Sequence, residues 1–156
     1  LEAPGATMSQ VIRTAHTWHR QGMDLLIVDY LQRMHPDRHA ERNDLEVGGM
    51  ARDMKTLAAE LGIPVLLLAQ LSRGLEQRPD KRPRMSDLRD SGQIEQEADN
   101  LLFLYRDAVY DENANAVEAE VLVEKQRQGP TGLIRMHWDG ETATWRDPDI
   151  PRLESE

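Results

Sequence analysis

Two short apolar runs, each of which ends at a polar residue, constrain the fold of this chain more than any other feature. Residues 25–28 read Leu-Leu-Ile-Val and are followed by Asp29, and residues 64–69 read Pro-Val-Leu-Leu-Leu-Ala and are followed by Gln70. Strands that are apolar on both faces belong in the middle of a covered, parallel sheet. A helical pattern precedes each run, and this alternation predicts an α/β sheet with right-handed crossovers.

Both helical patterns place apolar residues at the spacing of an amphipathic helix. In residues 9–20 these positions are Val11, Ile12, Ala15 and Trp18, and Gly22 can end the helix. In residues 44–61 they are Leu45, Met50, Met54, Leu57, Ala58 and Leu61, and Gly62 stops the pattern. We therefore expect one short and one long amphipathic helix in the first part of the chain.

The last third of the chain favours strands. Residues 101–105 read as a third buried strand, and residues 116–125 alternate between apolar and polar as a half-buried strand does. Asp139-Gly140 lies between two further strand-like segments, which is a strong β-hairpin signal. We expect one domain over residues 1–146 and a flexible tail over residues 147–156.

Composition excludes several classes of protein. The 156 residues include 19 Lys and Arg against 28 Asp and Glu, and a net charge of −9 excludes a protein that coats nucleic acid by bulk charge. The absence of cysteine excludes a disulfide framework, a thiol nucleophile and cysteine-ligated zinc. No apolar run is long enough to span a membrane and no signal peptide is visible, so we expect a soluble, cytoplasmic protein with no membrane partner. Because the chain starts at Leu1, we expect it to be a piece of a longer protein.

The polar residues behind the two apolar runs are the first candidates for chemistry. In open α/β sheets, ligands bind beyond the carboxyl ends of the strands. Asp29 could hold Mg²⁺, or its water shell, near phosphates, and Gln70 could sense a terminal phosphate. The alternative is that Asp29 caps the following turn and Gln70 is a solvated strand end.

A second candidate is the cation pair Lys125 and Arg127. The two residues lie two positions apart in a strand-like segment before a Gly-Pro turn, so a period of two would project both from one face. Such a pair suits phosphate binding, and the arginine could act as a finger. An exposed basic edge that discourages pairing between molecules is the alternative.

The third candidate is the segment 73–89, which holds six cations and three acids in a chain that is acidic overall. Its arginines include Arg73, Arg84 and Arg89, and Asp90 and Gly92 then lead into a short helix whose free N–H groups could accept phosphate. This pattern favours contact with a single nucleic acid strand through the backbone and a few cations. A solvated charged loop is an equally good interpretation.

Four segments together resemble a known family in order and spacing. They are residues 29–32 (Asp-Tyr-Leu-Gln), 68–73 (Leu-Ala-Gln-Leu-Ser-Arg), 84–99 (RMSDLRDSGQIEQEAD) and 125–132 (KQRQGPTG). Over about residues 4 to 145, the chain resembles the motor domain of DnaB-type replicative helicases. The resemblance implies a RecA-like P-loop NTPase core, a mostly parallel sheet flanked by helices, with C-terminal β-hairpins. It also implies a hexameric ring around single-stranded DNA, with ATP and Mg²⁺ bound between subunits and with primase and a helicase loader as partners.

Residue roles follow from the same resemblance. Asp29 matches the Walker B aspartate that positions Mg²⁺, and Gln70 matches the sensor that links the γ-phosphate to the DNA loops. Lys125 and Arg127 match hairpin cations that reach the nucleotide of the neighbouring subunit. The segment that follows the DNA backbone is matched by Arg89, Asp90 and Gly92.

One departure from the family pattern is important. The phosphate-binding loop Gly-x-x-x-x-Gly-Lys-Ser/Thr does not occur in this sequence, and neither does the catalytic glutamate that follows it in the family. We therefore expect the isolated chain neither to bind ATP tightly nor to hydrolyse it, and to have an incomplete core with an exposed strand edge or a self-paired one. The alternative function is a non-catalytic RecA-like module that binds partners or DNA.

Overall fold

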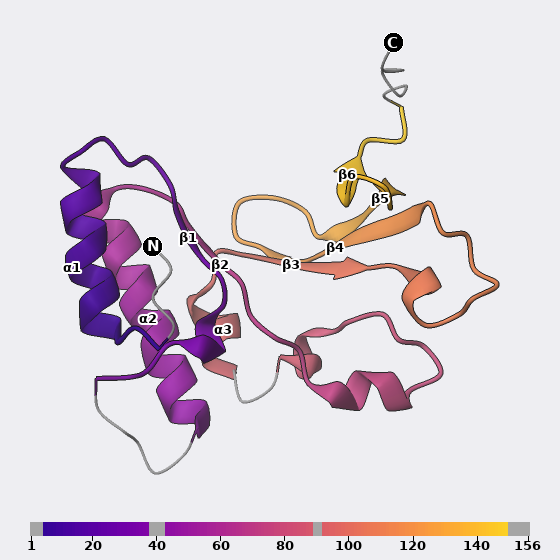
Figure 1. The fold of residues 1–156 in the computed structure, drawn as a ribbon. Helices are drawn as coiled ribbons and strands as arrows, with labels where there is room; N and C mark the ends of the chain where they lie inside the picture. The colour runs from indigo at the N-terminus through magenta and orange to yellow at the C-terminus, as the bar shows by residue number, and fades with distance from the viewer. Residues whose placement is uncertain (1–4, 38–42, 89–91, 150–156) are drawn as a thin grey trace. The chain divides into compact units, whose positions relative to one another are not determined.

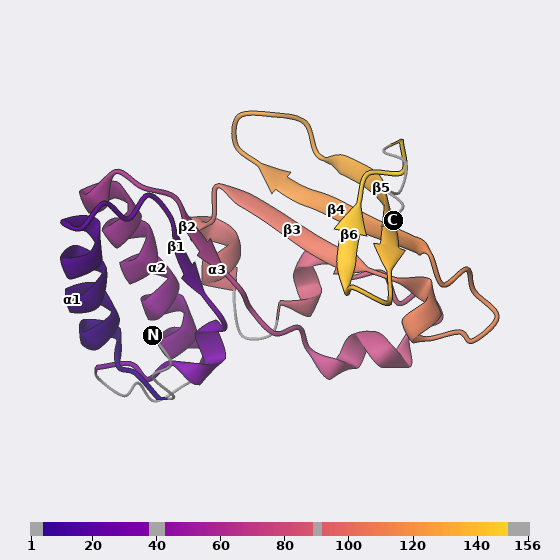
Figure 2. The same ribbon diagram turned by 45° about the horizontal axis from the view of Figure 1, so that its top comes forward.

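The computed structural model describes residues 5–37, 43–88 and 92–149. The chain divides into two compact units, each of which is described by itself. The first comprises Leu1–Ser72 with Ser86–Ala98, and the second comprises Arg73–Met85 with Asp99–Glu156. Figures 1 and 2 show the helices and strands of both units from two directions.

The first unit is built from helices and a parallel strand pair. Helix α1 (Met8–His19), strand β1 (Leu26–Val28), helix α2 (Asn43–Leu61) and strand β2 (Val65–Leu67) follow in order, and helix α3 (Gly92–Glu97) completes the unit. Strands β1 and β2 are parallel, with Leu26 opposite Val65 and Val28 opposite Leu67. Helices α1 and α2 lie on the same side of this strand pair in both views (Figures 1 and 2). The alternation of helix and strand predicted from the sequence is confirmed.

Helix boundaries follow from local chemistry. Thr7 caps α1, because its side chain accepts a hydrogen bond from the backbone N–H of Gln10 and the Gln10 side chain accepts one from the backbone N–H of Thr7. After α1 and after α2 the chain turns at a glycine with a positive φ, +93° at Gly22 and +65° at Gly62. This region of φ is costly for other residues, so both glycines end their helices as predicted.

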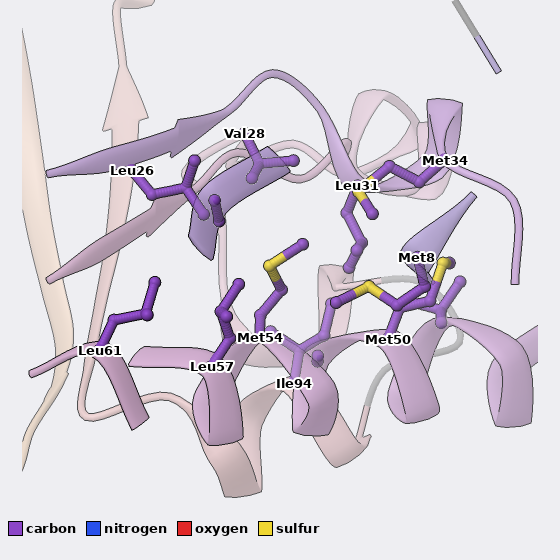
Figure 3. Close-up of a cluster of buried hydrophobic side chains, with 13 residues drawn as sticks. Met8, Leu26, Val28, Leu31, Met34, Met50, Met54, Leu57, Leu61 and Ile94 are labelled. Carbon is purple, nitrogen blue, oxygen red and sulfur yellow. The ribbon is translucent and has the colours of Figure 1, made fainter. Parts of the chain in front are cut away.

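The core of the first unit lies between the strand pair and the helices. Leu31 and Leu57 are 0% and 1% exposed. Figure 3 shows α2 and α3 directing their apolar side chains toward β1 and the turn after it. The labelled members of this cluster are Met8, Leu26, Val28, Leu31, Met34, Met50, Met54, Leu57, Leu61 and Ile94.

The opposite face of the strand pair is open, which corrects one expectation. The alternate residues of β1 and β2 point away from the helices, and Ile27 and Leu66 are 55% and 50% exposed. The prediction that this sheet is covered on both faces is therefore wrong for the described residues. The physical reason is that α1 and α2 pack on one side only. Because β1 and β2 form a two-stranded sheet, each has one edge without a strand partner among these residues.

The second unit contains an antiparallel sheet. Its strands are β3 (Asn100–Tyr105), β4 (Glu118–Gln126), β5 (Gly132–Asp139) and β6 (Thr144–Arg146), in that spatial order. The predicted hairpin is present, and because Asp139 pairs with Thr144 its loop consists of residues 140–143. The Asp139 carboxylate holds this loop by accepting hydrogen bonds from the backbone N–H groups of Glu141 (3.1 Å) and Thr142 (3.4 Å).

Strand β3 differs from the prediction. Leu101, Phe103 and Tyr105 are buried, whereas Leu102 and Leu104 are 53% and 60% exposed. The strand is therefore buried on one face and pairs antiparallel with β4, instead of forming a third buried strand. A short apolar run does not by itself distinguish a strand that is covered on both faces from one that is covered on one.

None of the described helices is both long enough and apolar enough to cross a membrane. Residues 147–149 are exposed, and residues 150–156 of the expected tail lie outside the described residues. The tail therefore stays a prediction.

Candidate functional site

Asp29 and Gln70 follow neighbouring parallel strands, and both lie at the carboxyl end of the strand pair. The backbone pairing continues past the strands, because the Leu68 N–H donates to the Val28 carbonyl (3.0 Å) and the Leu31 N–H donates to the Leu68 carbonyl (2.9 Å). Asp29 and Gln70 are both exposed. The structure thus places both candidate residues at the carboxyl end of the strands, which is the end where α/β sheets bind ligands.

Gln32 also lies at this end of the strand pair, although its place in the sequence predicts no role for it. Its amide oxygen accepts a hydrogen bond from the Gln70 N–H (3.1 Å), and its amide nitrogen donates to the Gln70 carbonyl (3.4 Å). One side chain therefore contacts both backbone groups of Gln70, as a strand partner does, and leaves the Gln70 side chain exposed. The only sequence signal was a glutamine three residues after Asp29, which is weak.

The residues at this edge fit a magnesium ion that is bound to phosphates. Asp29 offers one exposed carboxylate, and no group of three or more His, Cys, Asp or Glu residues that could hold a metal occurs among the described residues. Mg²⁺ in nucleotide sites keeps several waters and takes only one or two protein carboxylates together with phosphate oxygens. A single carboxylate at a strand end suits that coordination, whereas a metal site built only from protein ligands does not fit.

Lys125 and Arg127 lie at the end of β4 in the second unit. Lys125 is half-buried opposite Leu101, and Arg127 is in the exposed turn that leads to β5. The Arg127 N–H donates to the Asp99 carbonyl (3.0 Å), and its Nε lies 3.4 Å from Asp99 Oδ1. Both side chains of this ion pair are about half exposed, and such surface pairs contribute about 0–1 kcal/mol.

The structure describes three of the five residues that are predicted to contact DNA. Arg73 begins a short 3₁₀ helix (Arg73–Gln77) and is exposed, and Gly92 is the exposed first residue of α3. The exposed Arg84 lies 3.0 Å from an Asp80 carboxylate oxygen. Arg89 and Asp90 lie outside the described residues.

Two acidic residues bind cations of this loop. Hydrogen bonds from the Arg82 N–H and from the Arg84 side chain hold the pKa of Asp80 below its usual value. Glu120 of β4 accepts two hydrogen bonds from the Arg82 guanidinium, at 2.7 Å and 2.9 Å, and this pairing is the largest cause that raises the pKa of Arg82. The sequence count of six cations therefore overstates the positive charge that the loop presents.

The chain is similar to helicase domains over most of its length. The family model described as "DnaB-like helicase C terminal domain" matches residues 2–147. Replicative DNA helicase DnaB of Buchnera aphidicola (subspecies Acyrthosiphon pisum) is 44% identical over 142 residues, which are 89% of this chain and 31% of that protein. DnaB of Haemophilus influenzae is 43% identical over 143 residues, 90% of this chain and 31% of that protein. The chain thus spans about a third of the length of these relatives.

Solved structures give the same likeness. A DnaB-like replicative helicase, described with its interactions with primase, matches 94% of this chain and 37% of its own with a TM-score of 0.88 and 35% identity. A second solved structure, described as an ATPase domain, matches 92% of this chain and 52% of its own with a TM-score of 0.86 and 35% identity. These likenesses confirm the RecA-like α/β fold class that the sequence motifs implied.

Proposed function

This chain belongs to the family of DnaB-like helicase C-terminal domains, and on that premise we propose that it is part of the motor of a hexameric replicative DNA helicase. Such a motor couples ATP hydrolysis at subunit interfaces to translocation on single-stranded DNA and to duplex unwinding. The enzyme is the longer protein, and this chain supplies part of each site.

One observation carries the proposal: Asp29 and Gln70 both lie at the carboxyl end of a parallel strand pair, and Gln32 hydrogen-bonds the Gln70 backbone. We assign Asp29 to Mg²⁺ through its water shell and Gln70 to the terminal phosphate of ATP. Bound Mg²⁺-ATP supplies the phosphoanhydride bond whose cleavage drives the motor. Gln70 can respond to loss of that phosphate because its backbone is held while its side chain is free to reorient.

Lys125 and Arg127 would act on the nucleotide of the adjacent subunit. Lys125 is half-buried near the end of β4, Arg127 lies in the exposed turn that follows, and the ion pair of Arg127 with Asp99 lies at the surface. A cation delivered by a neighbour stabilises the charge that develops on the transferred phosphoryl group. This assignment makes Arg127 a catalytic residue in trans, and Lys125 a second phosphate contact.

Single-stranded DNA is the proposed track of the motor. Arg73 and Arg84 would contact its phosphates, and the main chain at Arg89, Asp90 and Gly92 would follow its backbone. Because the chain carries a net charge of −9, its DNA affinity should be modest and sensitive to salt. A primase is a proposed partner, since a similar helicase is described with one. We also propose a helicase loader, and the cytoplasm as the place of action.

The sharpest test uses the proposed division of each site between two subunits. A chimera places this chain into DnaB of Haemophilus influenzae, in place of its matching 143 residues. Asp29→Asn and Arg127→Ala should each abolish DNA-stimulated ATP hydrolysis, while Arg127→Ala spares nucleotide binding. In an equal mixture of the two variants, about a quarter of the interfaces regain both intact residues, so hydrolysis should return.

In the control mixture, the Arg127→Ala variant is replaced by the double variant Asp29→Asn/Arg127→Ala. No subunit of this mixture has an intact Asp29, so no interface has both intact residues. Failure of the first mixture to regain activity would show that Asp29 and Arg127 do not serve one shared site. If the chimera binds DNA but never hydrolyses ATP, the chain is instead a non-catalytic DNA-binding module. The isolated chain is expected to show neither tight ATP binding nor turnover.

A further inference from the structure

We propose that Arg82 is a positioning residue, which clamps the segment Arg73–Met85 to strand β4 through Glu120 and so holds Arg84 in place for single-stranded DNA. The inference rests on the proposed function, because it gives this segment a role in DNA binding. All of its residues lie within the second unit. Figure 1 shows the segment as a separate loop beside β3.

The contact between Arg82 and β4 is bidentate. Arg82 Nε lies 2.7 Å from one Glu120 carboxylate oxygen and Nη2 lies 2.9 Å from the other. Two parallel charge-assisted hydrogen bonds fix the orientation of a guanidinium group as well as its position. The Glu120 side chain is 19% exposed and that of Arg82 is 42% exposed, so the carboxylate end of the pair is partly shielded from solvent.

An aromatic side chain supports the same guanidinium. The Arg82 guanidinium carbon lies 4.9 Å from the ring centre of Tyr105, which is buried in β3, and the Tyr105 hydroxyl donates to Asp107. Tyr110 stacks on Tyr105 at 6.0 Å, and the Lys81 ammonium lies 5.6 Å from the Tyr110 ring centre. Two consecutive residues of the loop thus rest on two stacked rings of the sheet unit.

Arg82 is also the residue around which the loop is organised. Its backbone N–H donates to Asp80 (3.1 Å), and its carbonyl accepts a hydrogen bond from the Arg78 side chain (2.9 Å). The same Asp80 carboxylate binds Arg84. The position of the DNA-facing Arg84 is therefore linked through Asp80 to Arg82, and through Arg82 to β4.

The arrangement separates positioning from direct contact with DNA. The donors of Arg82 that face Glu120 are occupied by that carboxylate and are not directed at a phosphate. If Arg82 or Glu120 acted only through net charge, neutralising Glu120 would tighten DNA binding. If the pair positions the loop, neutralising Glu120 weakens binding, although an acidic charge has been removed. The two roles predict changes of opposite sign.

The experiment uses this chain and a fluorescein-labelled oligothymidylate, with affinity measured by fluorescence anisotropy over a salt series. Glu120→Gln should weaken binding by about tenfold, which corresponds to about 1.4 kcal/mol. The slope of log K against log salt should fall by about 0.7 for each phosphate contact that is lost. Glu118→Gln is the matched control, because Glu118 is exposed on the same strand and accepts a hydrogen bond from the nearby Asn115 side chain rather than from the loop. It should leave affinity unchanged or slightly higher.

A charge reversal tests the pair itself. Arg82→Glu should weaken binding, and the double variant Arg82→Glu/Glu120→Arg should restore at least part of it. Hydrogen exchange of the backbone amides in residues 73–85 should rise in Glu120→Gln and in Arg82→Glu and fall again in the double variant. This readout also covers the case in which a variant is destabilised, since exchange in β5 of the same unit reports on unfolding of the second unit.

The outcomes separate this inference from the proposed function. If the unmodified chain does not bind the oligonucleotide while exchange still rises in Glu120→Gln, the DNA-binding proposal fails and the clamp stands without its assigned role. If the chain binds and Glu120→Gln behaves like Glu118→Gln in both measurements, the positioning role of Arg82 is overturned.

Discussion

The Gln32 side chain hydrogen-bonds both backbone groups of Gln70, 38 residues further along the chain, and so extends the strand pair by one more link. Gln70 lies three residues beyond Leu67, which forms the last regular pair of β1 and β2 with Val28. The candidate phosphate sensor is therefore fixed by a side chain that comes from the segment after Asp29. A movement of that segment would therefore shift the backbone of Gln70.

Replacing Gln32 should lower the rate of ATP hydrolysis, with only a small loss in the free energy of unfolding. In the chimera, Gln32→Ala removes two hydrogen bonds at an exposed strand end, which together contribute about 1–2 kcal/mol. We expect kcat to fall by about tenfold with little change in the KM for ATP, because Gln70 is misplaced in the transition state. Steady-state kinetics measures both. Gln32→Glu keeps the acceptor for the Gln70 N–H but places a carboxylate oxygen against the Gln70 carbonyl oxygen, so kcat should fall here as well. An unchanged kcat in both variants would contradict the role of Gln32.

Adjacent glycines in α2 should respond oppositely to substitution. A Cβ at Gly48 would overlap the side-chain oxygen of Gln93 and lie 2.7 Å from its Cβ, whereas a Cβ at Gly49 meets nothing within 4 Å. Gly48→Ala should therefore destabilise the chain by about 1–3 kcal/mol through overpacking between α2 and α3. Gly49→Ala should stabilise it by about 0.5–1 kcal/mol, because alanine favours a helix interior. Urea midpoints of the two variants test this, and equal midpoints would contradict the close approach of α3 to α2.

The N-terminus of α1 should contribute a pH-dependent part of the stability. Asp37 accepts hydrogen bonds from the Ser9 hydroxyl (2.6 Å) and N–H (2.9 Å), and the hydroxyl contact is the largest cause that lowers the pKa of Asp37 below its usual value. Because the folded-state pKa is lowered, the contribution is present above the unfolded pKa of about 3.9 and is lost as the pH falls through the folded value.

The corresponding measurement compares the melting temperature of the chain with that of Asp37→Asn at about pH 6 and at about pH 3. The difference should be present at the higher pH and shrink at the lower one. Asp24→Asn, at an exposed position before β1, is the control for a general effect of charge. A difference for Asp37→Asn that does not change with pH would rule out the proposed linkage to Ser9.

The open face of the strand pair should make the isolated chain self-associate. Ile27 and Leu66 are half exposed in neighbouring strands, and Leu25 and Leu68 extend this apolar surface to exposed positions on either side. Contiguous apolar surface of this kind promotes association. Ile27→Lys should lower the apparent mass in sedimentation without lowering the melting temperature, because Ile27 does not contribute to the core. Association that is unaffected by Ile27→Lys and Leu66→Lys would show that this face is not the contact.

Much of the candidate site could be predicted from order along the chain. Asp29 and Gln70 were found because each ends an apolar run, and parallel strands place their carboxyl ends at one edge. The helix ends at Gly22 and Gly62 followed from the left-handed φ that glycine tolerates. The roles of Gln32 and Glu120 could not be predicted, because each acts on a residue 38 positions away.

By itself, the sequence determined the order of helices and strands, the residues at the strand ends and the motifs that mark the family, since all of these depend on neighbours within a few positions. Tertiary structure alone decided that β1 and β3 are buried on one face only, and that Arg82 faces a carboxylate. Burial and ion pairing depend on which distant segments come together. The composition of a strand or a loop does not indicate which segment it will contact.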